Sequence, residues 1–264
     1  MSNTRVLLSV AVLLMSANIC FAEQAEPLKF GFSADYYSKY IWRGQNLNDE
    51  SVFQPSVYVS KYGFTASAWG SVDLTNENAN SGEMTEVDYA LDYTAAMPGV
   101  TGVNVSLGTI YYRFPNTNFK STSEVYAGMS LGCTCDGQGK CLSCLCAPWF
   151  KVYRDVDEVK NGAYYQFGIG RTIQKVASLT DDSAVDCVLG ASTGYGNSSY
   201  NNGYFGVNDG KVNDLTLSMA LPIAIGNWTV KPNINYSMML RDTIRSGREN
   251  NDNLWGGVSL SRSF

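Results

Sequence analysis

Apolar and polar residues alternate with a period of two along almost the whole sequence, and this pattern constrains the fold more than any other feature. In TEVDYALDYTA, residues 85–95, Val87 and Leu91 share one face while Asp88 and Asp92 share the other. A β-strand sends successive side chains to opposite faces, so the pattern predicts strands with one apolar and one polar face. No ten-residue window carries a helical period, and no run reaches the roughly 18 apolar residues of a membrane helix. The chain is therefore predicted to be all-β.

Twelve segments carry the alternation, and the connections between them alternate in length. Tyr62-Gly63, AMPGVTG and Gly226-Asn227 are short and rich in turn residues, whereas the intervening connections are longer and rich in Asn and Ser. No connection suggests a domain boundary, so we expect one domain. The segments lie near residues 30–43, 51–61, 64–74, 84–95, 103–114, 122–131, 149–156, 162–171, 185–194, 214–224, 228–240 and 254–264.

Alternating strands build either a soluble sandwich with its apolar face inward or a membrane barrel with its apolar face outward. Ionisable residues in mid-strand fit both. An even number of strands closes a barrel without a free edge and places all short turns at one end, the periplasmic one, and all long connections outside. Aromatic residues near the segment ends suit the two interfacial girdles of such a barrel. They are Trp42, Tyr111, Tyr112, Phe114, Trp149, Phe150, Trp228 and Trp255. We therefore predict a single antiparallel transmembrane β-barrel of about 12 strands.

The N-terminal residues have the order of a secretory signal peptide. Arg5 precedes an apolar run from Val6 to Ile19, and Cys20-Phe21-Ala22 offers small residues for cleavage. The run is shorter than the roughly 20 residues that span a bilayer as a helix. An acylated Cys20 is the less favoured alternative, because Asn18 and Ile19 fit poorly before a lipoprotein cysteine. The expected division is a signal peptide at 1–22 and a barrel at 23–264.

The C-terminal stretch WGGVSLSRSF ends on Phe264, which shares a face with Val258 and Leu260. This ending is similar to that of bacterial outer-membrane barrels, which implies that the barrel-assembly machinery recognises Phe264. Arg262 stands where such endings usually have an apolar residue.

Several stretches resemble the TorF-type porin family of exported Gram-negative proteins. The similarity is densest over residues 33–74, with SKYIWRGQ as its most specific part, and continues in TEVDYALDYT, SEVYAGMSL and the C-terminal WGGVSLSRSF. The resemblance implies an outer-membrane barrel in contact with outer-membrane lipids, and it names no solute.

Charge and composition exclude several classes of function. The chain has 19 basic and 24 acidic residues, a net charge of −5 that argues against nucleic acid as a partner. It contains no histidine, so the serine–histidine logic of many hydrolases is unavailable. A carboxylate pair among Glu86, Asp88 and Asp92 could still act as acid and base, but we favour a hydrated pore wall. No enzymatic activity and no cofactor are expected.

The polar faces carry charges that would line the interior of a barrel. A mixture of acidic and basic side chains tunes selectivity in channels, although the same charges could pair and fill the interior. Twelve strands enclose more space than the eight whose side chains nearly fill a barrel, which favours a channel. The predicted pore-lining residues are Asp35, Lys39, Arg43, Glu86, Asp88, Asp92 and Lys231. We expect Lys39 and Arg43 to face the three carboxylates of residues 86–92.

Five cysteines fall within CTCDGQGKCLSCLC, in the connection 132–148 that is expected on the periplasmic side. One CxxC unit resembles half of a zinc site, but a second pair and any histidine are missing. A soft-metal thiolate cluster is the alternative, while export to an oxidising compartment favours disulfides. The candidates for disulfides are Cys133, Cys135, Cys141, Cys144, Cys146 and Cys187. Their connectivity stays open and no metal is assigned.

The function predicted from the sequence is passive diffusion of small hydrophilic solutes or ions across the outer membrane of a Gram-negative bacterium. The alternative is a non-conducting structural or adhesive barrel that presents its outer loops. Its candidate surface is the long extracellular connection 195–213, where Tyr200, Tyr204 and Phe205 lie among Asn and Gly. We expect this loop to be an ordinary connection.

Overall fold

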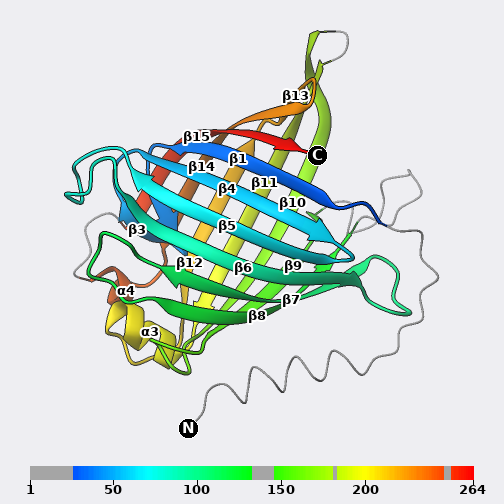
Figure 1. The fold of residues 1–264 in the computed structure, drawn as a ribbon. Coiled ribbons are helices and arrows are strands. Elements are labelled where there is room, and N and C mark those ends of the chain that lie inside the picture. Colours follow the sequence, from blue (N-terminus) through cyan, green and yellow to red (C-terminus); the bar gives the residue numbers. More distant parts are fainter. Residues whose placement is uncertain (1–25, 133–145, 181–182, 247–250) are drawn as a thin grey trace.

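The computed structural model describes residues 26–132, 146–180, 183–246 and 251–264, and within them it is built almost wholly from antiparallel strands (Figure 1). Two helices, α3 (Ser198–Phe205) and α4 (Asp242–Arg245), and three short strands, β2 (Tyr40–Trp42), β3 (Gln45–Asn48) and β13 (Ile223–Ile225), accompany the long strands. The long strands are β1 (Lys29–Tyr37), β4 (Val52–Lys61), β5 (Phe64–Asp73), β6 (Met84–Ala96), β7 (Val103–Arg113), β8 (Thr122–Leu131), β9 (Trp149–Asp155), β10 (Ala163–Thr180), β11 (Ser183–Gly196), β12 (Lys211–Ala220), β14 (Trp228–Met239) and β15 (Asp252–Ser263).

The long strands close into a ring. Over the described residues, 12 strands pair with their neighbours in sequence, and β1 pairs on one side with β4 and on the other with β15. Asp35 of β1 shows the closure, because it is in register with Gln54 of β4 and with Ser259 of β15. A closed ring satisfies the backbone N–H and C=O groups that an open edge would expose. The predicted all-β antiparallel barrel of 12 strands is confirmed.

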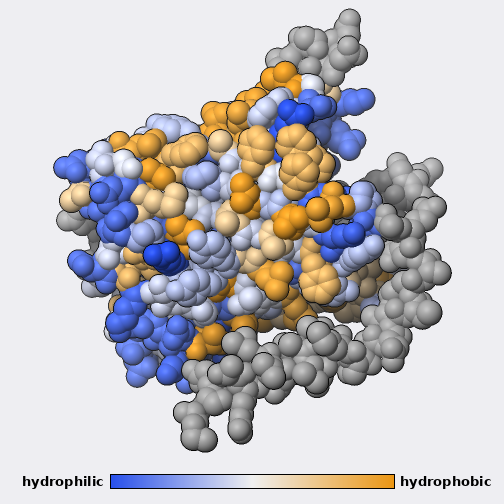
Figure 2. Space-filling view, in the orientation of Figure 1, coloured by the Kyte–Doolittle hydropathy of each residue, from blue (hydrophilic) through white to orange (hydrophobic). Residues whose placement is uncertain are grey.

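The register turns the apolar set of each strand outward. Val57, Leu91 and Leu107 are 56%, 50% and 56% exposed on the outside of the ring, and Figure 2 shows apolar side chains spread over this wall. Glu86 and Ser71, on the alternate positions, are buried inside the ring. Because a slip of one residue would exchange the two faces, the outward apolar wall fixes the register. Within the described residues, no helix is long and apolar enough to cross a bilayer.

The two ends of the barrel differ. The terminal end holds Lys29, Ser263 and tight connections such as Tyr62-Gly63, where φ is 52° and 79°. Two successive positive φ angles form the type I′ turn that suits a two-residue hairpin. The opposite end, called the loop end, holds α3, α4 and long polar connections such as the one between β5 and β6 (Figure 1).

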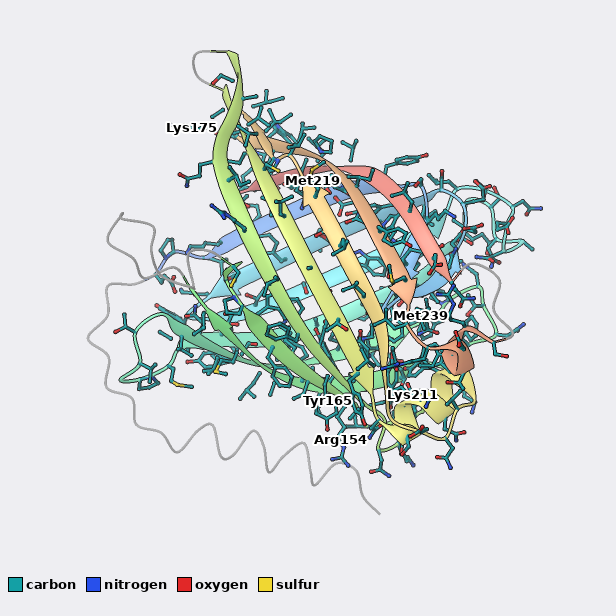
Figure 3. The ribbon with its side chains drawn as sticks, turned by 180° about the vertical axis from the view of Figure 1, so that it is seen from behind. Arg154, Tyr165, Lys175, Lys211, Met219 and Met239 are labelled. Atoms are coloured by element: carbon teal, nitrogen blue, oxygen red, sulfur yellow. The ribbon has the colours of Figure 1, made fainter. Side chains whose placement is uncertain are left out.

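β10 and β11 rise beyond their neighbours at the terminal end. β9 pairs with β10 only as far as Gly168, and the hairpin continues past that point. Figure 3 shows Lys175 on this extension. Lys175 has φ of 53°, and the register shifts between Ile173 and Ala177. These irregularities explain why the apolar–polar alternation of the sequence is weak between Arg171 and Cys187. In the described residues, β10 and β11 nevertheless pair as one hairpin.

The first predicted segment, 30–43, is not one strand. β1 ends at Tyr37, and β2 and β3 form a separate two-stranded sheet. Ser38 breaks the apolar alternation, and its N–H donates to Gly256 O at 2.9 Å. Arg43 and Gly44, with φ of 47° and 79°, form the turn between β2 and β3. This hairpin, residues 38–49, folds into the barrel and is called the transverse hairpin below.

An aromatic cluster covers the outer wall at the terminal end and accommodates the unusual Arg262. The rings of Phe30 and Phe264 are stacked with centroids 4.7 Å apart. Arg262 Cζ lies 4.4 Å from the Phe264 ring centroid and 5.5 Å from that of Trp228. The stem of an arginine can lie along an apolar surface while its charge is held by ring faces. Arg262 therefore replaces the usual apolar residue without leaving a bare charge on the wall.

Several aromatic residues assigned to the outer girdles point inward instead. Trp149 is in register with Gly168, where an added Cβ would lie 2.3 Å from the Trp149 ring. Gly194 likewise leaves space for Tyr164, whose Oη would be 1.8 Å from an added Cβ. Glycine in a strand often marks such a close approach of a neighbouring group. The inner aromatic rings therefore lie against the wall of the lumen. Trp42, Tyr112, Trp149 and Trp255 face inward, whereas Tyr111 and Phe150 are exposed outside.

Candidate functional site: the lumen and its transverse hairpin

The transverse hairpin is held to the far wall of the barrel by an ion pair. It enters between β1 and β4, and the Arg43 guanidinium at its tip donates to Glu124 of β8. Arg43 Nη1 lies 2.8 Å from Glu124 Oε1, and Nη2 lies 2.7 Å from Oε2. Two parallel charge-assisted bonds fix both position and orientation. The hairpin therefore spans the lumen as a crossbar.

Aromatic rings enclose the Arg43 guanidinium. Its Cζ lies 4.4 Å from the ring centroids of Trp42 and Tyr153 and 4.5 Å from that of Tyr164. The Arg43 and Glu124 side chains are 7% and 2% exposed. Burial alone would lower the pKa of Arg43, but the Glu124 carboxylate outweighs it and holds this pKa well above its ordinary value. The pair is a buried structural contact and leaves Arg43 unavailable to a solute.

The turn of the hairpin also touches a third side of the ring. A Cβ added to Gly44 would lie 2.6 Å from Asp214 Cβ of β12 and 2.6 Å from Met239 Sδ of β14. Asp214 is itself held by Tyr164, whose hydroxyl donates to its Oδ2 at 2.7 Å. Gly44 is therefore required by its positive φ and by this close approach.

The base of the hairpin is closed by polar contacts between its two arms. Lys39 forms an ion pair with Asp49. Asn46 Nδ2 donates to Asp49 Oδ1 at 2.7 Å and to Asn253 Oδ1 of β15 at 2.9 Å. Lys39 therefore belongs to the hairpin and not to the wall of the lumen.

Helix α3 covers the hairpin from the loop end. Asn197 caps the helix by accepting the Tyr200 N–H at 2.8 Å. Tyr204 packs on Trp42 with ring centroids 5.5 Å apart, and Tyr200 packs on Tyr164 at 5.2 Å. Tyr200 is only 1% exposed. The connection 195–213 therefore contains an ordered helix, and Tyr200 contributes to its inner packing.

The predicted pore-lining residues fall into two groups. Asp35, Glu86, Asp88, Asp92 and Lys231 lie at inner positions of β1, β6 and β14, in register with other inner residues. Lys39 and Arg43 lie on the hairpin. They pair with Asp49 and Glu124 and do not face the β6 carboxylates, because the chain leaves the wall after Tyr37.

The inner wall keeps an excess of carboxylates after these pairs are formed. Asp92 accepts hydrogen bonds from Tyr126 Oη at 2.6 Å and from Thr94 Oγ1 at 2.7 Å. Asp35 Oδ1 and Asp88 Oδ1 are buried without a partner among the described residues. No described group of three or more Cys, Asp or Glu could hold a metal ion. The arrangement is a polar, mainly acidic wall.

Residues of the site that the sequence analysis missed are Glu124, Tyr153, Tyr164 and Asp214. The alternation in SEVYAGMSL places Glu124 on the polar face of its strand, which is the one local signal. Its partner lies 81 residues away in the chain, and no spacing rule connects the two.

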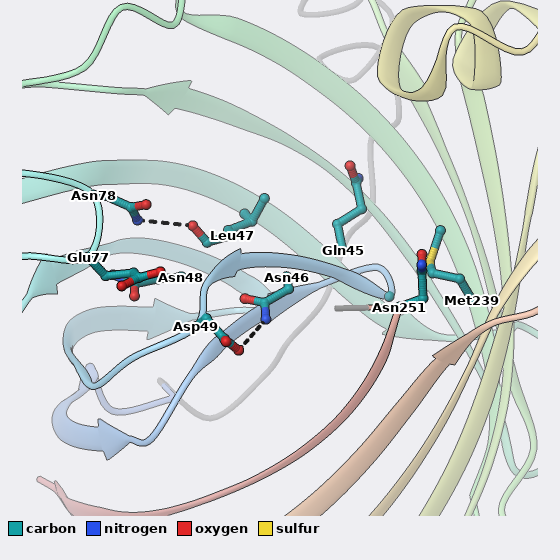
Figure 4. A pocket seen from close by; sticks show the side chains of 10 residues that line it. Gln45, Asn46, Leu47, Asn48, Asp49, Glu77, Asn78, Met239 and Asn251 are labelled. Atoms are coloured by element: carbon teal, nitrogen blue, oxygen red, sulfur yellow. Dashed lines mark hydrogen bonds between the residues drawn. The ribbon is translucent and has the colours of Figure 1, made fainter. Parts of the chain in front are cut away.

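Two recesses lie on either side of the hairpin. The outer recess, of about 250 Å³, is lined by β3, by Glu77 and Asn78, and by Met239 and Asn251 (Figure 4). The inner recess, of about 230 Å³, is lined by Tyr37, Lys39, Tyr40, Ile41, Gln54, Asn235 and Trp255. The hairpin therefore borders both recesses, with β3 lining the outer one and β2 lining the inner one.

Other predicted residues lie at the terminal end or outside the described residues. Phe264 exchanges backbone hydrogen bonds with Phe30. Cys187 lies in β11, in register with Ile173. Cys146 begins the described part that precedes β9. The signal peptide 1–22 and four cysteines, Cys133, Cys135, Cys141 and Cys144, lie outside the described residues. Disulfide formation stays a prediction.

Comparison with known proteins shows similarity in structure only. No family model and no curated protein matches the sequence, so the TorF resemblance stays a prediction. The KdgM porin has a TM-score of 0.48 at 11% identity, covering 89% of this chain and 99% of that one. The NanC porin has 0.49 at 11%, covering 88% and 98%. The COG4313 outer membrane channel from Pseudomonas putida F1 has 0.46 at 6%, covering 94% and 100%.

Proposed function

We propose that this protein is an outer-membrane channel through which small hydrophilic solutes or ions diffuse passively in a Gram-negative bacterium. The observation that carries the proposal is the closed ring with an apolar outer wall and a charged inner wall. An outward apolar band and a polar interior are the two surfaces that a membrane channel requires. No chemical step and no cofactor are part of this function.

The flat packing of inner aromatic rings supports an open lumen. Trp149 lies over Gly168 and so does not fill the centre of the barrel at its position, whereas Tyr164 lies over Gly194 and packs against the crossbar. A ring of 12 strands also has a wider interior than a ring of eight, whose side chains nearly fill it. The transverse hairpin then sets the narrowest part, and we propose that it restricts passage to small solutes.

The loop end faces the outside of the cell in this proposal, and the terminal end faces the periplasm. Bacterial barrels have short periplasmic turns and longer extracellular connections, and α3, α4 and the transverse hairpin all lie at the loop end. Phe264 then lies at the periplasmic end, where the barrel-assembly machinery would bind it.

The inner charges favour cations. Arg43 and Lys39 are neutralised by Glu124 and Asp49. The remaining inner charges in the described residues include more carboxylates than ammonium groups, with Asp35, Glu86, Asp88 and Asp92 against Lys151 and Lys231. Charged rings of this sign attract cations into a pore.

Reversal potentials in a planar bilayer under a salt gradient test this proposal. The purified barrel should give a potential of the sign expected for cation flow. An anion-selective potential would contradict the assignment of the inner wall.

The alternative is a non-conducting structural or adhesive barrel, and the crossbar of Arg43 and Glu124 is the observation that favours it. The adhesive form is less favoured, because Tyr200 lies on the buried face of α3, packed against Tyr164, and is not presented at the surface. Removing residues 197–209 separates the two functions: changed conductance with unchanged surface binding would eliminate the adhesive one.

A further inference from the structure

The outer recess lies where a solute entering from the loop end first meets the hairpin. Its volume of about 250 Å³ is many times the roughly 10–15 Å³ that a cavity needs to hold one water molecule. Figure 4 shows that its side chains come from the hairpin, from the β5–β6 connection and from the β14–β15 region. This space suits one small ring-shaped solute.

Side-chain amides dominate the lining of the recess. Some of them are engaged, since Asn78 Nδ2 donates to Leu47 O at 3.2 Å and Asn46 Nδ2 donates to Asp49 Oδ1 at 2.7 Å. Amide groups carry both donors and acceptors. The amide side chains are Gln45, Asn46, Asn48, Asn78 and Asn251.

Two of these amides carry buried donors without a partner. Gln45 is 5% exposed and Asn48 is 3% exposed. Gln45 Nε2 and Asn48 Nδ2 have no hydrogen-bond acceptor among the described residues. A buried donor costs free energy until it is paired. Both residues line the recess. Their donor atoms are covered in this conformation, and a turn of either amide toward an occupant with acceptor oxygens would relieve this cost.

The neighbouring carboxylates limit the charge of such an occupant. Glu77 also lines the recess, and its negative charge opposes a carboxylate or phosphate ligand, whereas Asp49 is already paired with Lys39. The amide N–H groups of Gln45 and Asn48 oppose a bare cation. An uncharged ligand with hydroxyl groups satisfies both, because a hydroxyl accepts from an amide and donates to a carboxylate. Leu47 and Met239 add apolar contacts for the C–H face of a ring.

We propose that the outer recess is a binding site for a neutral saccharide unit, with Gln45 and Asn48 as its hydrogen-bond donors. The proposal rests on the channel function, because the site would concentrate such a solute at the entrance of the lumen. The inner recess has compatible chemistry, with the aromatic residues Tyr37, Tyr40 and Trp255 beside two amides. Sites with aromatic walls and a few polar groups are typical for small ligands.

The test is equilibrium binding to the purified full chain in detergent, measured by saturation-transfer NMR without any flux. The probes are methyl α-glucopyranoside, glucuronate and glucosamine. The neutral glucoside should bind best. Gln45→Leu with Asn48→Leu should weaken its binding by about tenfold or more, because two hydrogen bonds are lost. Asn118→Leu, on the exposed β7–β8 connection, is the matched control and should leave binding unchanged.

The double variant could fail to fold, and loss of the heat-dependent shift in gel mobility would reveal this. A second variant then tests the proposal independently. Glu77 is exposed, so Glu77→Gln should fold, and it should allow glucuronate to bind where the wild type does not. Equal binding of glucuronate and glucoside by the wild type would overturn the proposal.

Failure of the site and failure of the channel give different results. Conductance without binding of any probe means that the recess holds water only, and the saccharide site is wrong. Glucoside binding that is lost in the double variant, in a protein without conductance, supports the site and contradicts the channel.

Discussion

Arg43 and Glu124 meet inside the barrel, although 81 residues separate them in the chain. Arg43 occupies the tip of a hairpin that starts between β1 and β4, and Glu124 lies on β8, where Tyr112 Oη also donates to it at 2.8 Å. The contact therefore joins two opposite parts of the wall through the lumen. It explains why the transverse hairpin folds inward. It also makes the stability of the barrel depend on an ion pair in its interior.

Removal of one partner of this pair should destabilise the barrel strongly. Glu124→Leu leaves the Arg43 guanidinium buried without its counter-ion, which costs about 3–5 kcal/mol in comparable buried pairs. Arg43→Met combined with Glu124→Leu should be less destabilised than Glu124→Leu alone, because no uncompensated charge remains. Urea unfolding in detergent, followed by gel mobility, measures both.

The exposed pair of Lys120 and Glu158 provides the control for this prediction. Its side chains are 76% and 44% exposed, and exposed pairs contribute about 0–1 kcal/mol. Lys120→Ala should therefore leave the unfolding midpoint nearly unchanged. A loss for Glu124→Leu as small as that for Lys120→Ala would show that the crossbar contributes nothing to stability.

The inner glycines should differ in their tolerance of alanine according to the ring that covers them. Gly194→Ala places Cβ 1.8 Å from Tyr164 Oη and should cost about 1–3 kcal/mol by overpacking. Gly170→Ala on the adjacent β10 meets only Leu189 O at 3.6 Å, an ordinary contact, and should be tolerated. The unfolding midpoints of the two variants measure this difference. Equal losses of stability would mean that Tyr164 does not lie against the wall.

Neutralising carboxylates of the inner wall should reduce cation preference and leave assembly intact. Asp88→Asn with Asp92→Asn replaces two carboxyl groups of β6 by amides while preserving side-chain size, and the amide oxygen introduced at position 92 can still accept the Tyr126 hydrogen bond. The reversal potential under a salt gradient should move toward zero. Asp209→Asn, on the connection that follows α3, is the control and should leave the potential unchanged. An unchanged potential in the double variant would remove β6 from the conducting path.

The cysteines should be oxidised in protein matured in the periplasm. We expect fewer than two free thiols on titration under denaturing conditions, and no stoichiometric zinc or copper by elemental analysis, because an oxidising compartment favours disulfides over free thiolates. Five or six free thiols together with bound metal would reverse this assignment.

The alternation of the sequence was sufficient to predict the strands of the ring, because each strand turns its apolar face outward and its polar face inward. It was not sufficient for the transverse hairpin. Tyr40 and Trp42 continue the apolar phase of β1, and only the turn at Arg43 and Gly44 marks the reversal. The direction in which that hairpin folds depends on Glu124, which lies far away in the sequence.

The inner aromatic residues were assigned to the girdles for a related reason. Position near a strand end does not reveal the face on which a ring lies. Trp149 points inward because Gly168 on the neighbouring strand gives it space. Such pairs across strands become visible only when the register between the strands is known.

Single-channel conductance of the wild type beside a variant without the crossbar tests the central claim most directly. The variant replaces residues 39–49 with a short Gly-Ser linker, and heat-dependent gel mobility verifies that both barrels are folded and inserted. The account predicts small conductance steps for the wild type and larger steps for the variant, because the hairpin forms the narrowest part of an open lumen. An inserted wild-type barrel that shows no conductance steps would contradict it.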